Sequence, residues 1–237
     1  MKIAALDSSG MAASAAVFED GVLLAEYTVN YKMTHSQTLL PMLDEIVKIL
    51  QLDLASIDAI AVAAGPGSFT GLRIGSATAK GLGLALGKPL VPVPTVDALA
   101  FNLYGVKGLI CPIMDARRNQ VYTGIYRYEG SRLQTVEKQQ AIGLEELCRK
   151  LNSLGEDVIF LGDGVPVGRK MIQELLTVPY SFAPGHLARQ RAGAVAALAE
   201  QYLSDGRIQM VNAADHSPVY LRPSQAERER AAREDAK

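Results

Sequence analysis

The sequence is poor in the features that mark secreted, membrane-spanning or nucleic-acid-binding proteins. Its 237 residues carry 24 Lys and Arg against 25 Asp and Glu, so charge of neither sign is in excess. A protein dedicated to nucleic acid needs a basic face that neutralises phosphates, and this balance argues against one. The N-terminal segment reaches an acidic residue at position 7, which is too early for a signal peptide. No apolar run is long enough to span a bilayer. We expect a cytoplasmic protein with no membrane contact.

Cysteine and histidine are also scarce. The two cysteines lie far apart, Cys111 in an apolar run and Cys148 in an amphipathic one, which predicts buried thiols in a reducing compartment. None of the three histidines is followed by another within three to five residues, so the spacing offers no zinc site. We therefore predict neither metal nor cofactor. These histidines are His35, His186 and His216.

The common nucleotide and nucleophile motifs are missing as well. Gly87-Lys88 is followed by proline, which excludes a P-loop, and the glycines in 81–86 lack the third glycine of a dinucleotide-binding turn. Ser68 is flanked by Pro66 and Thr70 where a nucleophile elbow needs glycines. Ser68 is better interpreted as the N-cap of a helix.

The segment 57–86 is the most informative part of what is present. An apolar run at 57–64 predicts a buried strand, a glycine-rich turn stops it, and a helix follows from about residue 70 to 86. Four small residues recur at four-residue spacing on one face of that helix. Each glycine inside a helix costs about 1 kcal/mol against alanine, so the stripe predicts a close approach of another backbone. The four are Gly71, Gly75, Ala79 and Gly83.

The preceding helix, from about residue 36 or 38 to 50, has an unusually wide apolar face. Its apolar residues fill about half of the helical circumference, more than contact with one sheet requires. We predict that helix 70–86 packs closely against this helix through the stripe of small residues, and that the shared outer surface of the two helices binds a partner. The predicted partner-binding residues are the four small residues of the stripe together with Leu39, Leu43, Ile46 and Leu50.

The order of expected elements occurs twice along the chain. Residues 1–104 predict three strands, a helix, and then alternating strands and helices, and a similar series starts again near residue 108. This pattern predicts two α/β lobes, each a mixed sheet with covering helices. We place the N-terminal, partner-binding lobe at 1–104 and the C-terminal lobe at 105–222. The charged segment 223–237 is expected to be a flexible tail.

One turn resembles part of a phosphate site. In two-lobed kinases, an Asp followed by small hydroxyl residues closes the first hairpin against a phosphate, and Asp7, Ser8 and Ser9 fit that description. The matching hairpin at 115–119 has no glycine and carries two arginines, so the clamp would be incomplete. The turn 162–164 is either a relic of an adenosine-binding turn or a plain connection from strand to helix.

Several motifs together resemble the TsaB (YeaZ) family, bacterial subunits of tRNA threonylcarbamoyladenosine synthesis. The resemblance covers residues 1–222, and its most specific part is Gly-Pro-Gly-Ser-Phe-Thr-Gly-Leu-Arg at 65–73. The family implies a two-lobed actin-like or hexokinase-like (ASKHA) fold, in agreement with the repeat. The other matching segments are Leu6-Asp-Ser-Ser9, His35-Ser-Gln-Thr-Leu-Leu-Pro41, Asp115-Ala-Arg117 with Val121-Tyr122, and Pro218-Val-Tyr-Leu-Arg222.

The resemblance also implies a division of labour with a catalytic homologue. TsaD binds a metal through a His-x-x-x-His pair, and the corresponding positions here are Thr95 and Leu99, which cannot replace the imidazoles. The resemblance therefore implies a non-catalytic subunit. It would support TsaD in transferring the threonylcarbamoyl group to N6 of the adenosine next to the anticodon, with TsaE joining the pair and TsaC making the threonylcarbamoyl adenylate.

Two further expectations accompany this interpretation. Alone, the chain should form a homodimer, and it should meet tRNA only through the complex. The alternatives are an enzyme acting alone, either an actin-fold ATPase or a metallopeptidase-like protein. The residues at positions 95 and 99 argue against the peptidase, and the hairpin at 115–119 argues against the ATPase.

Overall fold

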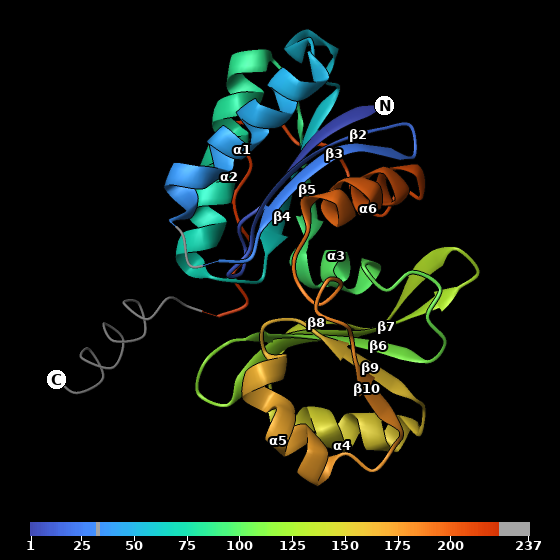
Figure 1. The fold of residues 1–237 in the computed structure, drawn as a ribbon. Coiled ribbons are helices and arrows are strands. Elements are labelled where there is room, and N and C mark those ends of the chain that lie inside the picture. The colour runs from blue at the N-terminus through green and yellow to red at the C-terminus, as the bar shows by residue number, and fades with distance from the viewer. Residues whose placement is uncertain (32–33, 223–237) are drawn as a thin grey trace, which may run out of the picture.

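The computed structural model describes residues 1–31 and 34–222, and the predicted tail at 223–237 lies outside them. Two five-stranded sheets lie one above the other in Figure 1, with helices around and between them. The first part of the chain forms β1 (Lys2–Asp7), β2 (Ala13–Glu19), β3 (Val22–Val29), α1 (His35–Leu50), β4 (Ala59–Gly65), α2 (Phe69–Leu86), β5 (Leu90–Pro94) and α3 (Thr95–Phe101). The second part forms β6 (Leu109–Asp115), β7 (Gln120–Glu129), β8 (Arg132–Gly143), α4 (Leu144–Leu154), β9 (Val158–Leu161), α5 (Val165–Leu175), β10 (Tyr180–Phe182) and α6 (Ala192–Ser204).

The two sheets share one strand order, which confirms the expected repeat. The first runs β3-β2-β1-β4-β5, and the second, read in the same sense, runs β8-β7-β6-β9-β10. In each sheet the three strands of the opening meander pair antiparallel, while the remaining pairs are parallel. The central strands β1 and β4 are apolar and almost wholly buried, as expected for strands covered on both faces. The short edge strand β10 was not predicted from the sequence.

Helices cover both faces of the first sheet and the outer face of the second. Helices α1 and α2 pack on one face of the first sheet and α6 on the other. Helices α4 and α5 cover the outer face of the second sheet, whose inner face packs on α3. Figure 1 shows α3 and α6 in the space between the two sheets.

The chain returns to the first lobe after β10, which the sequence-based division at residue 104 did not anticipate. Helix α6 packs its apolar face on β1, β2 and β4, and the segment after it bridges β5 through Leu90 and Val211. Helix α6 also starts at residue 192 rather than near 188. Its first N–H groups are capped from the sheet, because Ser14 Oγ accepts from Ala192 N and Glu26 Oε1 accepts from Gly193 N.

Two smaller expectations can be checked in the described residues. Both cysteines are free and buried, as predicted, and burial raises the pKa of Cys111 to about 12. Within residues 1–31 and 34–222, every helix is too short or too polar to serve as a membrane-spanning segment.

Candidate functional site

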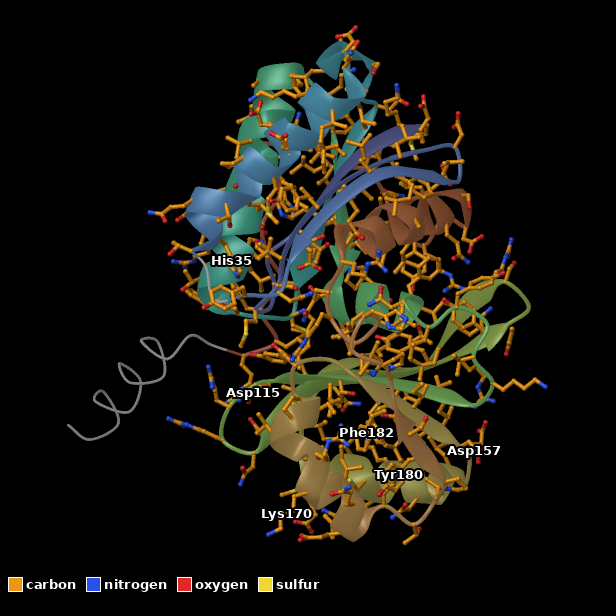
Figure 2. All side chains as sticks on the ribbon, in the orientation of Figure 1. His35, Asp115, Asp157, Lys170, Tyr180 and Phe182 are labelled. Atoms are coloured by element: carbon orange, nitrogen blue, oxygen red, sulfur yellow. The ribbon has the colours of Figure 1, made fainter. Side chains whose placement is uncertain are left out.

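A cavity of about 660 Å³ lies between the lobes and is the candidate functional site. The first lobe contributes the β1–β2 turn and the turn before α2, and the second lobe contributes the β6–β7 turn and the start of α5. Asp115 lies where the two lobes meet (Figure 2). The polar and charged side chains that line the cavity are those of Ser9, Ser68, Thr70, Asp115, Arg117, Tyr122, Asp163, Tyr220 and Arg222.

The Asp7-Ser8-Ser9 turn is closed on itself. The Asp7 carboxylate accepts hydrogen bonds from Ser9 N at 2.8 Å and Ser9 Oγ at 2.6 Å, and Ser8 Oγ donates to Gly71 O at 2.8 Å. All three residues are buried, and of the three only Ser9 lines the cavity. Burial raises the pKa of Asp7 to about 6, although the hydrogen bonds from Ser9 act in the opposite direction. Both serine hydroxyls and the Ser9 amide therefore have partners without a ligand.

The glycine stripe of α2 packs directly against this turn. A Cβ added to Gly71 would collide with Ser8 O, and a Cβ added to Gly75 would lie 2.6 Å from Ser8 Oγ. Further along, a Cβ on Gly83 would lie 2.7 Å from the Cβ of Ala213 in the C-terminal segment. The predicted close approach is thus confirmed, but it is made by the β1–β2 turn and the C-terminal segment. The prediction that these glycines face helix α1 was wrong.

The predicted partner-binding residues are mostly interior. Leu39, Leu43, Ile46 and Ala79 belong to the core between α1, α2 and the first sheet, each 3% exposed or less, and Leu50 is partly buried. The wide apolar arc of α1 is divided between this core and solvent. The large apolar side chains that remain exposed on α1 and α2 are Leu40, Ile49 and Leu84.

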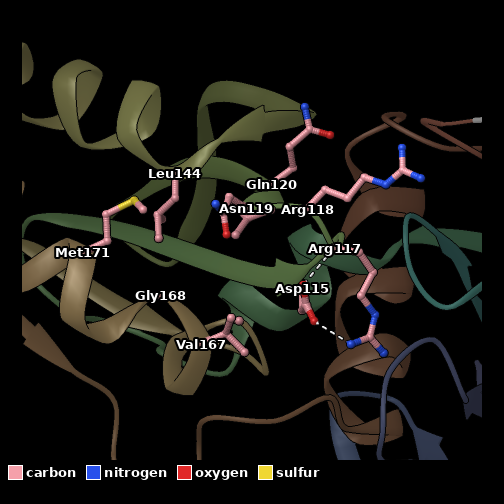
Figure 3. A pocket seen from close by; sticks show the side chains of 11 residues that line it. Asp115, Arg117, Arg118, Asn119, Gln120, Leu144, Val167, Gly168 and Met171 are labelled. Carbon is pink, nitrogen blue, oxygen red and sulfur yellow. Dashed lines mark hydrogen bonds and ion pairs between the residues drawn. The ribbon is translucent and has the colours of Figure 1, made fainter.

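The β6–β7 turn is open and basic. Arg117, Arg118 and Asn119 take left-handed backbone angles in succession, with φ of 66°, 56° and 57°. The Asp115 carboxylate accepts from Arg117 N at 2.8 Å and pairs with the Arg117 guanidinium at 3.1 Å. Figure 3 shows this pair beside a second cavity of about 250 Å³ between the turn and α5, while Arg118 extends away from it. Asp115 therefore already occupies the Arg117 amide, which a phosphate would otherwise use.

The 162–164 turn contributes one more carboxylate to the cleft. Asp163 Oδ1 accepts from Asp115 N at 3.3 Å, and burial raises the pKa of Asp163. Its charge also contributes to the raised pKa of Asp7. Among residues 1–31 and 34–222, however, no three His, Cys, Asp or Glu side chains are arranged to hold a metal ion.

The structure keeps the three histidines in separate places. His35 is the first residue of α1, and its Nε2 lies 2.9 Å from Gly10 O (Figure 2). His216 is buried, its Nε2 lies 3.0 Å from Ser76 Oγ, and desolvation lowers its pKa. His186 is exposed in the loop before α6. Thr34 is the N-cap residue of α1, and His35 connects the start of this helix to the β1–β2 turn.

Thr95 and Leu99 have structural contacts of their own. Thr95 is fully buried, and its Oγ1 accepts from Gly65 N at 3.0 Å, which fixes the turn before α2. Leu99 is 1% exposed and packs in the core between α3 and the second sheet.

Residues 218–222 form a sequence motif that was not predicted to be part of a site. The C-terminal segment runs along the cleft, where Val219 N donates to Ala64 O at 2.7 Å and Arg222 Nη1 donates to Ala116 O at 2.8 Å. The Tyr220 ring lies 4.8 Å from that of Phe69. The signal was the unusual Pro-Val-Tyr-Leu-Arg sequence at 218–222, whose position only the folded chain reveals.

Comparison with known proteins identifies the family. The family model described as TsaD: tRNA N6-adenosine threonylcarbamoyltransferase matches residues 23–230. A TsaB protein of Bacillus subtilis is 35% identical over 176 residues, 74% of this chain and 77% of that protein. The chain belongs to the TsaB family.

Other TsaB relatives match over a larger part of the chain. The Escherichia coli TsaB is 29% identical, and the alignment covers 94% of this chain and 95% of that protein. The solved structure of YeaZ from Pseudomonas aeruginosa is 27% identical, covers 93% of this chain and 99% of that one, and has a TM-score of 0.79. These matches confirm the resemblance seen in the motifs and the expected two-lobed actin-like fold.

Proposed function

We propose that this protein is a non-catalytic subunit that supports TsaD in the transfer of the threonylcarbamoyl group to N6 of adenosine beside the anticodon of tRNA. Its role in tRNA threonylcarbamoyladenosine biosynthesis follows from its membership of the TsaB family. The observation that carries the non-catalytic part is the use of Thr95 and Leu99 as buried structural residues. Threonine bonded to a backbone amide and leucine in a core offer no imidazole for a metal.

The closed β1–β2 turn supports the same proposal against a stand-alone ATPase. Two amides that could bind a phosphate here are already used, because Ser9 N donates to Asp7 and Ser68 N, just before α2, donates to Ser9 O at 2.7 Å. The isolated chain should hydrolyse no ATP above background. Calorimetry should show millimolar binding at best, about −4 kcal/mol, and micromolar binding would favour the ATPase.

A reconstituted modification assay tests the proposal directly. With TsaC, TsaD and TsaE present, omission of this chain should stop formation of the modified nucleoside in tRNA. The exposed His186→Ala and the more conservative His35→Gln and His216→Asn variants should retain modification within a few-fold of wild type. A histidine variant that is folded and still bound to TsaD but has no activity would contradict the non-catalytic assignment.

We further propose that the exposed face of α1 and α2 in the first lobe docks TsaD and, in its absence, a second copy of this chain. Its apolar centre is formed by Leu40, Ile49 and Leu84, which are 49%, 71% and 61% exposed. Exposed apolar side chains on adjacent helices support association. TsaE would join the resulting pair, tRNA would be reached only through the complex, and the cytoplasm is the proposed compartment.

Gly81 provides a clean test of this surface. It lies on the exposed side of α2, and a Cβ built there meets nothing within 4 Å, so Gly81→Glu should leave the monomer folded. This variant should lose co-elution with TsaD and the homodimer. Gly185→Glu, the same change in open space in the loop before α6, is the matched control. Unchanged co-elution of Gly81→Glu would reject the docking surface.

A further inference from the structure

Three side chains join the two sheets through one buried carboxylate. Asp97 lies in α3, between the sheets. Tyr126 OH, from β7 of the second sheet, donates to Asp97 Oδ1 at 2.7 Å. Tyr202 OH, from α6 on the first sheet, donates to Asp97 Oδ2 at 2.8 Å. Each carboxylate oxygen is therefore held from a different lobe.

This cluster lies deep in the molecule. Tyr126 is fully buried, Tyr202 is 3% exposed and Asp97 is 9% exposed. Burial raises the pKa of Asp97, and the two tyrosine hydroxyls lower it. A buried carboxylate that loses a donor is left with an uncompensated polar group, which is costly. The hydrogen bonds therefore resist any separation of β7 from α6.

Apolar packing surrounds the cluster and continues across the junction. Leu99 and Ala100 of α3, and Leu103 just after it, pack with Ile110 and Leu161 of the second sheet. On the other side of α3, Ala98 shares a core with α6 and the first sheet. Hinge motion between lobes usually depends on a few loop or terminal residues. Here a hinge motion would expose apolar side chains of these two cores to water.

The C-terminal segment adds a second connection between the lobes. It is bonded to the first lobe through Val219 N and Ala64 O, and it reaches the second lobe through the Arg222 guanidinium and Ala116 O. The Tyr220 hydroxyl, which accepts from Arg73 Nε at 3.3 Å, fixes the segment between these two points. The lobes are thus joined both at the buried junction and along the cleft.

We propose that Asp97, Tyr126 and Tyr202 form an inter-lobe lock that holds the two lobes at one fixed angle. The cleft then does not open and close as it does in two-lobed enzymes that bend around a ligand. The α1–α2 face and the second lobe move as one rigid body, and a partner bound to one lobe meets the other in a constant position. The lock does not depend on the identity of that partner.

Distance measurements between the lobes test the lock. Spin labels are placed on the full chain at Ala77→Cys in α2 and Lys170→Cys in α5, both exposed positions, while the natural cysteines are buried. Diluted with excess unlabelled chain, so that any dimer carries one labelled copy, the otherwise unaltered chain should give one narrow distance distribution in pulsed electron paramagnetic resonance. With Tyr126→Phe and Tyr202→Phe together, the rings remain but both hydroxyls are lost, and the distribution should broaden at least two-fold.

Tyr128→Phe is the matched control. Its hydroxyl donates to Phe101 O at 3.3 Å, at the same junction but outside the Asp97 cluster, so the distribution should stay narrow. If circular dichroism shows that the double variant does not fold, the single variant Tyr202→Phe is used instead. Its inter-lobe distance distribution should broaden by a smaller amount. A folded lock variant with the unaltered distribution, or a broad distribution in the unaltered chain itself, would overturn the proposal.

Discussion

The β1–β2 turn of the first lobe and the β6–β7 turn of the second occupy equivalent places in two sheets of the same strand order. In the first, Asp7, Ser8 and Ser9 are buried beneath the start of α2. In the second, Arg117 and Arg118 are exposed and the backbone is left-handed. Both turns begin with an aspartate that accepts from a backbone amide two residues later.

The comparison shows that one local motif can be used in two ways, depending on what packs over it. Glycines in α2 allow the helix backbone to touch Ser8, which closes the first turn. At the second turn, a cavity of about 250 Å³ lies between the turn and α5. In both turns the aspartate already binds an amide that a phosphate would otherwise use.

The largest expected effect is at the seal over the first turn. A Cβ on Gly71 would collide with Ser8 O, a backbone atom that cannot rotate away. We expect Gly71→Ala to lower the free energy of unfolding by about 3 kcal/mol. In the same helix, Gly81→Ala meets nothing and should raise it by about 1 kcal/mol. Urea unfolding of both variants measures this contrast, and equal effects would mean that the first turn is not sealed by close packing.

Substitution of Thr95 tests how the turn between β4 and α2 is held. Thr95→Val keeps the shape but leaves Gly65 N–H buried without an acceptor. The expected loss is about 2 kcal/mol of unfolding free energy. Thr95→Ser retains the hydroxyl and should lose clearly less in the same urea titration. If valine is tolerated as well as serine, the hydrogen bond does not hold the turn.

A pH titration sharpens the comparison of the two aspartates. The pKa of Asp7 is raised from 3.8 to about 6 in the folded chain, so the folded state binds the proton more tightly than the unfolded state. This contribution to stability is fully present below pH 3.8 and is lost as the pH rises through 6. When the pH is lowered from 7 to 5, the free energy of unfolding of the unaltered protein should therefore rise by about 1 kcal/mol relative to that of Asp7→Asn.

Asp115→Asn is the control for that titration. Because Asp115→Asn leaves Asp7 in place, its free energy of unfolding should rise as much as that of the unaltered protein. Both rises are measured relative to Asp7→Asn. Urea unfolding at the two pH values measures all three proteins. If Asp7→Asn shows the full gain, another group is responsible for it.

The smallest expected effect is at the open turn. Arg118 is exposed and has a φ of 56°, which costs a side-chain-bearing residue about 1–2 kcal/mol. Glycine removes that strain but loses more chain entropy on folding, so Arg118→Gly should gain about 0.5 kcal/mol of unfolding free energy. Arg118→Ala keeps the strained backbone and should gain nothing. A loss with glycine would mean that the arginine side chain stabilises the turn.

Local patterns in the sequence determined much of this fold. Apolar runs located β1, β4 and β6, and the glycine-rich turn located the start of α2, where Ser68 Oγ accepts from Gly71 N at 3.3 Å as its N-cap. Such features depend on neighbours a few residues away, and they can be read directly. The repeated order of elements likewise predicted two sheets of one plan.

The sequence also indicated that the glycine stripe needs close contact, and the resemblance to the TsaB family implied that Thr95 and Leu99 stand where TsaD has its metal-binding pair. It could not say which backbone approaches the stripe, because Ser8 and Ala213 are 63 and 130 residues from their glycine neighbours Gly71 and Gly83. Only tertiary packing decided that this contact is internal, that α6 returns to the first sheet, and that Asp97 takes one tyrosine from each lobe. Contacts between distant segments depend on how whole faces of the lobes bury apolar surface together, which no local period records.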